Sequence, residues 1–245
     1  MRVAGEKIQF RSDVTVELVR HSASDADVLF AARVSTQGEA TLESASSGAA
    51  AGERDQGLIN YLMRDRHGSP FEHNSLTFYV QAPIFVFREF MRHRIASYNE
   101  ESGRYRELRP VFYVPGPERK LVQVGKPGAY DFEDGTPEQT TMVQDEIKAV
   151  CTGAYESYQR MLAEGVAREV ARAVLPVTLY SSMYVTMNAR SLMNFLSLRT
   201  KREGTRFPSF PQREIEMVAE KMENLWVPLM PMTAATFSEN GRVAP

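Results

Sequence analysis

The sequence has little cysteine, little net charge and no long apolar run, and each shortage excludes a class of protein. Cys151 is the only cysteine among 245 residues, so an internal disulfide framework and a zinc site of several thiolates are excluded. The 29 basic and 31 acidic residues leave a net charge of -2, which argues against partners recognised by bulk charge. No stretch approaches the roughly 18 apolar residues of a membrane span, and residues 1–10 lack the apolar core of a signal peptide. We therefore expect a cytoplasmic protein that binds neither nucleic acid nor membrane.

The spacing of apolar residues predicts an α+β fold. Hydrophobic residues make up 43% of the chain, which is enough for one large core, so we expect a single domain over residues 1–245. Few strands stand among many helices without regular βαβ alternation, which predicts a small, mostly antiparallel sheet flanked by several helices. The expected strands are 7–11, 14–19, 76–81 and 111–114, and the expected helices begin after Ser24 and cover 58–63, 83–91, 136–164, 166–174, 188–201 and 212–225. Residues 43–52 and 115–135 are expected to be loops.

Charged residues are concentrated between Arg88 and Arg109. This stretch of 22 positions holds six arginines, four glutamates and one histidine. A solvated charged loop is the simplest interpretation, since charge runs are usually exposed faces. The order of the residues favours another one, because arginines interleaved with Ser97, Asn99, Ser102 and Gly103 combine bidentate donors, hydroxyls and backbone N–H groups. These are the groups that a phosphate monoester requires.

Three stretches together carry a resemblance to a known family. Arg92-His93-Arg94, followed after seven residues by Ser102, resembles the signature of the flavin-dependent thymidylate synthases. The sequence around it, residues 67–73 upstream and residues 175–199 downstream are similar to the same family. The likeness extends from about residue 24 to residue 225, and the chain is identified as a member of that family.

The resemblance implies an activity and a fold. Members convert dUMP to dTMP, taking the carbon from 5,10-methylenetetrahydrofolate and the hydride from FAD that NADPH has reduced. They are homotetramers of the flavin-dependent thymidylate synthase fold, with active sites built from more than one subunit. The protein's task is then to hold planar molecules together and to stabilise charge on the pyrimidine.

The resemblance also implies site residues. Arg199 is the expected catalytic residue, facing N3 or O4 of the uracil. The dUMP site is expected to comprise Glu89, Arg92, Glu100, Ser102, Gly103, Arg104, Arg172 and Arg199. The FAD site is expected to comprise Ser69, Arg92, His93, Arg94, Glu100, Asn188, Arg190 and Asn194. Arg190 and Asn194 are four residues apart and would share one helix face.

Some residues invite other interpretations. Cys151 lies in an expected long helix without a basic neighbour, so it is predicted to be a small buried residue rather than a nucleophile. Ser102 has no base visibly placed to deprotonate it, and it is interpreted as a nucleotide contact. His67 and His73 lack an obvious third ligand, so no metal site is expected. Arg199 could also simply satisfy the last carbonyls of its helix.

Two rival functions and two departures from the family pattern remain. In a nucleotide- or RNA-binding module, the arginines would grip phosphates while Tyr98, Tyr105 and Phe112 stack on bases. A flavin reductase would act without a pyrimidine.

Glu89 stands where many relatives have glutamine, which alone can donate a hydrogen bond, and residues 201–211 form an unusually long link.

Overall fold

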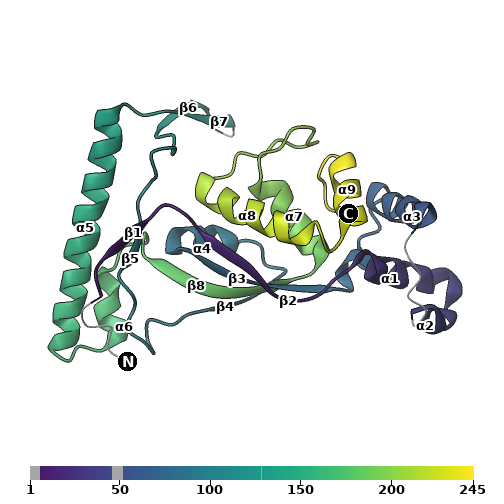
Figure 1. Ribbon diagram of the computed structural model, residues 1–245, viewed down its shortest axis with the longest axis horizontal. Helices are drawn as coiled ribbons and strands as arrows, with labels where there is room; N and C mark the ends of the chain where they lie inside the picture. The colour runs from purple at the N-terminus through teal and green to yellow at the C-terminus, as the bar shows by residue number, and fades with distance from the viewer. Residues whose placement is uncertain (1–5, 46–51, 128) are drawn as a thin grey trace. The chain divides into compact units, whose positions relative to one another are not determined.

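The computed structural model describes residues 6–45, 52–127 and 129–245, and they form an α+β fold, as the sequence predicts (Figure 1). The strands are β1 (Gln9–Arg11), β2 (Thr15–Ser22), β3 (Ser75–Pro83), β4 (Ser97–Glu100), β5 (Val111–Tyr113), β6 (Val122–Lys126), β7 (Ala129–Glu133) and β8 (Tyr180–Met187). The α-helices are α1 (Asp25–Gln37), α2 (Ala40–Ala45), α3 (Glu53–Arg64), α4 (Ile84–Phe90), α5 (Pro137–Ala163), α6 (Arg168–Ala171), α7 (Ala189–Arg199), α8 (Arg213–Trp226) and α9 (Pro231–Glu239), with 3-10 turns η1 (Ser69–Glu72) and η2 (Arg172–Val174).

Contacts between residues divide the chain into two compact units. The first unit contains Gln81–Arg92 and Asn99–Met183 together with the stretch that ends at Thr15. The second unit contains Val16–Val80, His93–Tyr98 and Tyr184–Pro245. The four-stranded sheet has the order β2-β3-β8-β4, and the chain passes from one unit to the other within each of these strands. The expectation of a single domain stays a prediction, and each unit is described separately.

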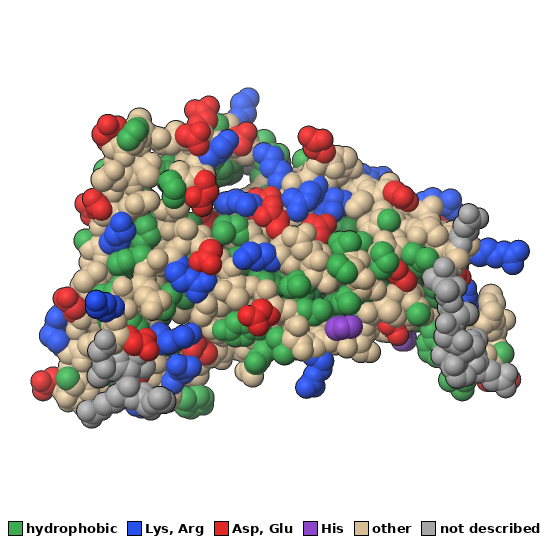
Figure 2. Space-filling model, in the orientation of Figure 1, with side chains coloured by type: hydrophobic (Ala, Val, Ile, Leu, Met, Phe, Trp, Pro, Cys, Tyr) green, Lys and Arg blue, Asp and Glu red, His purple; other side chains and the backbone are tan. Residues whose placement is uncertain are grey.

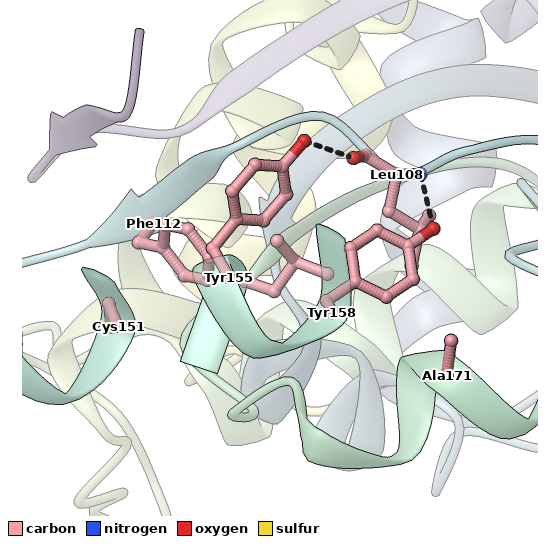
Figure 3. Close-up of a cluster of buried hydrophobic side chains, with 7 residues drawn as sticks. Leu108, Phe112, Cys151, Tyr155, Tyr158 and Ala171 are labelled. Atoms are coloured by element: carbon pink, nitrogen blue, oxygen red, sulfur yellow. Dashed lines mark hydrogen bonds between the residues drawn. The ribbon is translucent and has the colours of Figure 1, made fainter. Parts of the chain in front are cut away.

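The first unit is built on α5. Thr136 caps this helix by accepting a hydrogen bond from the Gln139 N–H, while the Gln139 side chain accepts one from the Thr136 N–H, so a capping box begins the helix expected over residues 136–164. One face of α5 packs in the core cluster shown in Figure 3, which comprises Leu108, Phe112, Cys151, Tyr155, Tyr158, Ala171 and Leu179. The rest of the unit is organised around this helix.

Two tyrosines of α5 fix the backbone at Leu108. The Tyr155 hydroxyl donates to the Leu108 carbonyl, and the Leu108 N–H donates to the Tyr158 hydroxyl, both at 3.2 Å (Figure 3). Both rings are buried, so losing either hydrogen bond would leave a buried polar group unsatisfied. The chain is thereby anchored at the end of the arginine-rich stretch, next to Arg109.

The second unit packs helices through buried polar contacts as well as apolar ones. The amphipathic helix α8 buries Ile215, Val218, Ala219, Met222 and Trp226 at helical spacing. Helix α9 buries Thr233 and Thr236 beside the apolar Ala234 and Phe237. The Asp25 carboxylate accepts from the Thr233 N–H and hydroxyl, and Gln56 donates to the Thr236 hydroxyl. These contacts satisfy the polar groups that the buried face of α9 carries.

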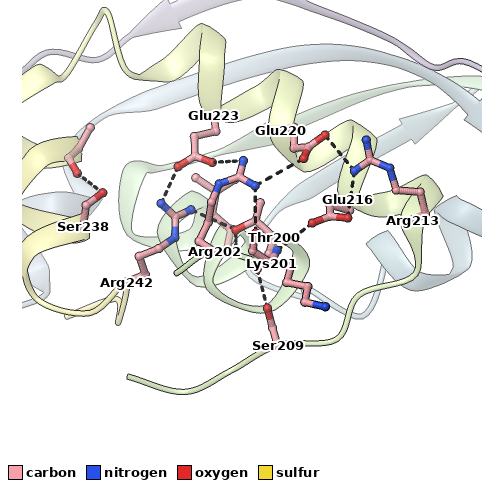
Figure 4. Close-up of polar contacts among 12 residues, drawn as sticks. Thr200, Lys201, Arg202, Ser209, Arg213, Glu216, Glu220, Glu223, Ser238 and Arg242 are labelled. Atoms are coloured by element: carbon pink, nitrogen blue, oxygen red, sulfur yellow. Dashed lines mark hydrogen bonds and ion pairs between the residues drawn. The ribbon is translucent and has the colours of Figure 1, made fainter. Parts of the chain in front are cut away.

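A network of ion pairs holds the segment after α7 against α8 (Figure 4). Arg242 pairs with Glu223 at 2.7 Å and donates to the Thr200 hydroxyl at 3.1 Å, and its side chain is only 7% exposed. Arg202 pairs with Glu223 at 3.2 Å and with Glu220 at 3.5 Å. The Ser209 hydroxyl donates to the Thr200 carbonyl. The residue that follows Arg199 is therefore held from several sides.

Several elements differ from the predictions. Strand β8 was not predicted, because its buried Ser181 lies next to the buried Tyr180 and breaks the apolar alternation. Residues 115–135, expected to be a loop, contain the β6–β7 hairpin, in which Gly125 has a φ of 88°. Strand β4 and helix α9 were also missed. Residues 43–45 belong to α2 rather than to the expected loop, and residues 46–51 of that loop lie outside the described residues.

The surface agrees with the small net charge. Acidic and basic side chains are intermixed on the face shown in Figure 2. Within the part of the chain that the structure describes, no helix is long and apolar enough to cross a membrane.

Candidate functional site

The first unit contains a cavity of about 400 Å³, a size typical of small-molecule sites. It is lined by Ile84, Glu100, Glu101, Gly103, Leu108, Glu169, Arg172, Ala173, Leu175, Leu179 and Ser181. Three of the residues expected to hold a nucleotide, Glu100, Gly103 and Arg172, are thus brought together from β4, the loop after it and η2. The apolar wall and the few polar groups can hold a small polar molecule with an apolar face.

Gly103 allows the arginine side chain to approach the loop. A Cβ atom at this position would lie 2.8 Å from Leu108 Cδ1 and 3.2 Å from Arg172 Cδ. A side chain there would push Leu108 away from the tyrosines that fix its backbone, or displace the stem of Arg172. Glycine is therefore required for the close packing of Arg172 against the loop.

Two further arginines of the first unit pair with carboxylates next to the cavity. Arg104 Nε lies 2.8 Å from Glu169 Oε2, and both side chains are more than half exposed. Arg106 lies 3.4 Å from Glu101. The Ser102 hydroxyl accepts the Arg104 N–H at 3.2 Å, so it orders the loop backbone. These exposed pairs are weak in water, and an anionic ligand can compete for the guanidinium groups.

Glu89 and Arg92 lie at the end of α4. Glu89 is half-buried, Arg92 is exposed, and the Arg92 N–H donates to the Glu89 carbonyl at 3.2 Å. Neither residue is among those that line the cavity. Their expected contact with the nucleotide stays a prediction.

The second unit joins the turn of residues 67–73 to the start of α7. Asn188 caps α7 by accepting the Ser191 N–H at 2.9 Å, and Asn74 accepts the Ala189 N–H at 2.7 Å. Arg190 pairs with Glu72 on η1. The turn of residues 67–73 and the start of α7 are two of the three stretches that carry the resemblance. They are therefore in direct contact, although they are more than a hundred residues apart in sequence.

The Arg190 side chain forms an ion pair and a hydrogen bond with other groups of the protein. Besides Glu72, its Nε donates to the Pro245 carbonyl, and a Cβ at Gly68 would lie 2.5 Å from its guanidinium carbon. Gly68 thus provides the space that the Arg190 guanidinium occupies. The expected role of Arg190 toward a flavin stays a prediction.

Arg199 is the last residue of α7 and contacts His93. Its Nε lies 3.1 Å from His93 Nε2, and both side chains are partly buried. Burial and the charge of Arg199 lower the pKa of His93 from its ordinary 6.5 to about 4. The imidazole is therefore neutral at physiological pH and accepts the hydrogen bond. His93 and the end of α7 are thus brought into contact within the second unit.

The remaining expected flavin contacts are exposed polar groups. Ser69, Arg94 and Asn194 present a hydroxyl, a guanidinium and an amide to solvent. His67 stacks on Tyr61 with a centroid distance of 5.4 Å. A dinucleotide with an anionic diphosphate and a polar-edged ring system requires donors of these kinds, so the residues present fit a flavin cofactor.

Some contributors were not nominated from the sequence. Asn74 accepts a hydrogen bond from α7, Glu72 pairs with Arg190, Phe195 packs against His93, and Glu169 pairs with Arg104 from α6. Glu72 and Phe195 lie inside stretches that carry the resemblance and Asn74 lies beside one of them, whereas Glu169 had no such signal. Cys151 is buried, as predicted, and burial raises the pKa of its thiol. Residues 6–45, 52–127 and 129–245 contain no group of three His, Cys, Asp or Glu placed to bind a metal ion.

Comparisons with known proteins identify a family and several relatives of this chain. The family model described as thymidylate synthase complementing protein matches residues 17–232. The flavin-dependent thymidylate synthase of Streptomyces coelicolor is 67% identical over 240 residues, which cover 98% of this chain and 96% of that protein. The flavin-dependent thymidylate synthase of Tropheryma whipplei is 61% identical over 238 residues, covering 96% of this chain and 97% of that protein.

A solved structure is similar over nearly the whole chain. It is the UMP/dUMP methylase PolB from Streptomyces cacaoi bound with 5-Br dUMP. The TM-score is 0.90, the identity is 55%, and the match covers 97% of this chain and 100% of that one. The complex of the same methylase with 5-Br UMP has a TM-score of 0.88.

Proposed function

The chain belongs to the family of flavin-dependent thymidylate synthases, and on this premise we propose that it converts dUMP to dTMP by reductive methylation. The observation that carries the proposal is that Glu100, Gly103 and Arg172 meet around one cavity. They come from two distant stretches, and together they offer a cationic group, a carboxylate and a close approach to backbone. These are the requirements for binding a nucleotide monophosphate.

The first unit's part is to bind the nucleotide. Arg172 binds the phosphate or the pyrimidine from the cavity wall, and Arg104 exchanges its contact with Glu169 for the anionic substrate. Ser102 and Gly103 keep the loop close to the ligand, while Glu100 accepts a hydrogen bond from it. Glu89 and Arg92 complete the expected set in the assembled enzyme, which we propose is a homotetramer with shared active sites.

The second unit's part is to bind the flavin and to stabilise charge. Ser69, Arg94, Asn188, Arg190 and Asn194 contribute donors to the cofactor, which we propose is FAD and which, when bound, supplies a hydride. The Arg199 guanidinium faces the pyrimidine and stabilises negative charge at N3 or O4, so that C5 becomes electron-rich. We propose that His93, together with Arg92 and Glu100, also contributes to the FAD site of the assembled enzyme.

The chain offers no thiolate for the alternative chemistry. The pKa of the Cys151 thiol is raised by burial, and its sulfur contacts the Thr178 hydroxyl at 3.3 Å in the core. We propose that 5,10-methylenetetrahydrofolate would supply the carbon that replaces the C5 hydrogen, without an enzymic cysteine. Bound reduced FAD would supply the hydride that completes the methyl group, and we propose NADPH as the source of the electrons and the cytoplasm as the compartment.

The test is product formation by the purified protein. The protein is incubated with dUMP, methylenetetrahydrofolate, NADPH and FAD, and dTMP is measured. Formation of dTMP supports the proposal, and its absence with intact, flavin-loaded protein contradicts it. UMP is assayed in parallel, because the structurally similar methylase is described as acting on both nucleotides.

The same preparation separates the rival functions. A nucleotide- or RNA-binding module would be colourless and would lose affinity steeply with salt. A flavin reductase would oxidise NADPH without responding to dUMP. The proposed enzyme is yellow, and dUMP changes both its flavin spectrum and its rate of flavin oxidation.

A further inference from the structure

His93 is held in place from three directions within the second unit. Its ring lies edge-on to Phe195 of α7, with a centroid distance of 4.9 Å and an interplanar angle of 77°. Its backbone carbonyl accepts the Tyr98 hydroxyl at 2.6 Å. Its Nε2 lies 3.1 Å from Arg199 Nε. A ring fixed in this way presents one defined nitrogen to Arg199.

The contact with Arg199 determines the protonation state of the ring. An arginine side chain has only hydrogen-bond donors, so His93 Nε2 must carry the lone pair and the proton must lie on Nδ1. A protonated imidazole would place two positive charges at hydrogen-bond distance in a partly buried site. The neutral Nδ1–H tautomer is the state that the geometry requires.

The contact also limits the orientation of Arg199. The guanidinium group is planar, so anchoring its Nε–H sets the plane and the direction of the two terminal nitrogens. The backbone is held as well, because Thr200 is fully buried and donates from both its N–H and its hydroxyl to the Leu196 carbonyl. The side chain is thus fixed at its base and at its Nε.

We propose that His93 is a positioning residue for Arg199: by accepting the Nε–H hydrogen bond, it aims the terminal guanidinium nitrogens at the pyrimidine. The inference rests on the proposed function and deepens it. It assigns to His93 a role through Arg199, in addition to the flavin contact expected for it.

Two substitutions test separately the hydrogen-bond acceptor and the aromatic ring of His93. His93→Gln keeps an acceptor near the position of Nε2 and removes the ring, whereas His93→Phe keeps a ring against Phe195 and removes the acceptor. We expect His93→Phe to lower kcat at saturating FAD at least tenfold more than His93→Gln, while KM for dUMP changes less than threefold in both variants. The same two substitutions at the exposed His21 are the control, because they show the effect of replacing a histidine by glutamine or phenylalanine at another position.

Arg199→Ala provides the second arm of the experiment. If His93 acts through Arg199, adding His93→Phe to Arg199→Ala causes no further loss of kcat, because the positioned group is already absent. A full additional loss in the double variant overturns the proposal. So does an equal loss of kcat in His93→Gln and His93→Phe. His93→Leu is carried alongside, and loss of folding or flavin in both apolar variants also overturns the proposal.

A spectroscopic measurement is independent of turnover. The chain has four histidines, so selective ¹⁵N labelling gives a tractable spectrum, and His93→Gln identifies the signal that disappears. The His93 signal should show protonated Nδ1 and unprotonated Nε2 at neutral pH, and the Nε2–H tautomer or a doubly protonated ring would overturn the proposal. If the wild-type protein forms no dTMP, the proposed function fails. If it forms dTMP and the His93 variants do not behave as described, only the inference fails.

Discussion

The two units hold their functional arginines in different ways. In the first unit, Arg104 pairs with Glu169 and Arg106 with Glu101, and both arginine side chains are more than half exposed. In the second unit, Arg199 is partly buried and is held by the neutral His93. The carboxylates in the first unit carry a charge opposite to that of their arginines, whereas the imidazole that accepts the Arg199 hydrogen bond in the second unit is uncharged.

This difference matches two tasks. Exposed ion pairs contribute about 0–1 kcal/mol, so a phosphate can replace a carboxylate at little cost. A group that stabilises a developing charge is most effective when it is already oriented and needs no rearrangement. The first unit is therefore suited to exchanging partners on binding, and the second to holding one group still.

The largest effect is expected from removing the oriented guanidinium. Arg199→Ala should lower kcat about 100- to 1,000-fold with flavin still bound, because the charge on the pyrimidine loses its stabilising partner. Steady-state kinetics and flavin absorption measure the two quantities. Cys151→Ala is the contrasting variant and should keep substantial activity. A Cys151→Ala enzyme as inactive as Arg199→Ala would show that the thiol takes part in the reaction.

The next effect is expected in the network that supports the second unit. Arg242→Ala should lower the free energy of unfolding by about 3 kcal/mol, because it breaks a nearly buried ion pair with Glu223. Chemical denaturation measures the change. Arg213→Ala, in which the lost side chain is 45% exposed, should cost less than about 1 kcal/mol. Equal losses of unfolding free energy in the two variants would contradict the expected difference between the buried and the exposed ion pair.

Nucleotide binding in the first unit should depend on Arg172. Arg172→Ala should raise KM for dUMP about tenfold or more with a smaller change in kcat, because a charged hydrogen bond contributes about 1.5–3 kcal/mol to binding. Arg168→Ala is the matched control, since Arg168 lines a different cavity of the same unit. A rise in KM of the same size in both variants would exclude the cavity around Gly103 as the nucleotide site.

The neutral imidazole should also affect stability in acid. The folded-state pKa of His93, about 4, lies below its ordinary value of 6.5, so the unfolded chain takes up this proton first as the pH falls. Its contribution to stability is complete above pH 6.5 and is lost progressively toward pH 4. His93→Gln should show a shallower decline of melting temperature over this interval. An unchanged slope would mean that His93 titrates normally in the folded protein.

The smallest effect is expected at the exposed pairs. Glu169→Gln removes the charge that competes for Arg104, so KM for dUMP should fall about two- to threefold while stability changes by less than about 0.5 kcal/mol. Titration with dUMP and thermal melting measure both. Glu203→Gln, at an exposed position of the second unit, should leave KM unchanged. An increase in KM for Glu169→Gln would mean that this carboxylate helps to bind the nucleotide.

Strong local signals made part of the fold predictable. The helix starts at Thr136 and Ser24 and the apolar spacing of α3, α5 and α8 correspond to elements that the structure contains. Elements with buried polar residues were missed. Strand β8 buries Ser181, and α9 buries Thr233 and Thr236, whose partners Asp25 and Gln56 are about two hundred residues away. A hydrophobic pattern cannot reveal a polar face that a distant residue satisfies.

The candidate site divides in the same way. The order of residues from Arg88 to Arg109 and the block ending at Arg199 were enough to identify the family and to nominate the arginines. Which arginine pairs with a carboxylate and which with an imidazole could not be read from those stretches. Glu169 reaches Arg104 from α6, and His93 reaches Arg199 from more than a hundred positions upstream.

The amino-acid order alone determined residue chemistry, local helix starts and membership of a family, because these depend on neighbours along the chain. Tertiary structure decided the charge state of His93, the direction of Arg199 and the space that Gly103 leaves for Arg172. Each of these depends on desolvation and on partners that only folding brings within a few ångströms.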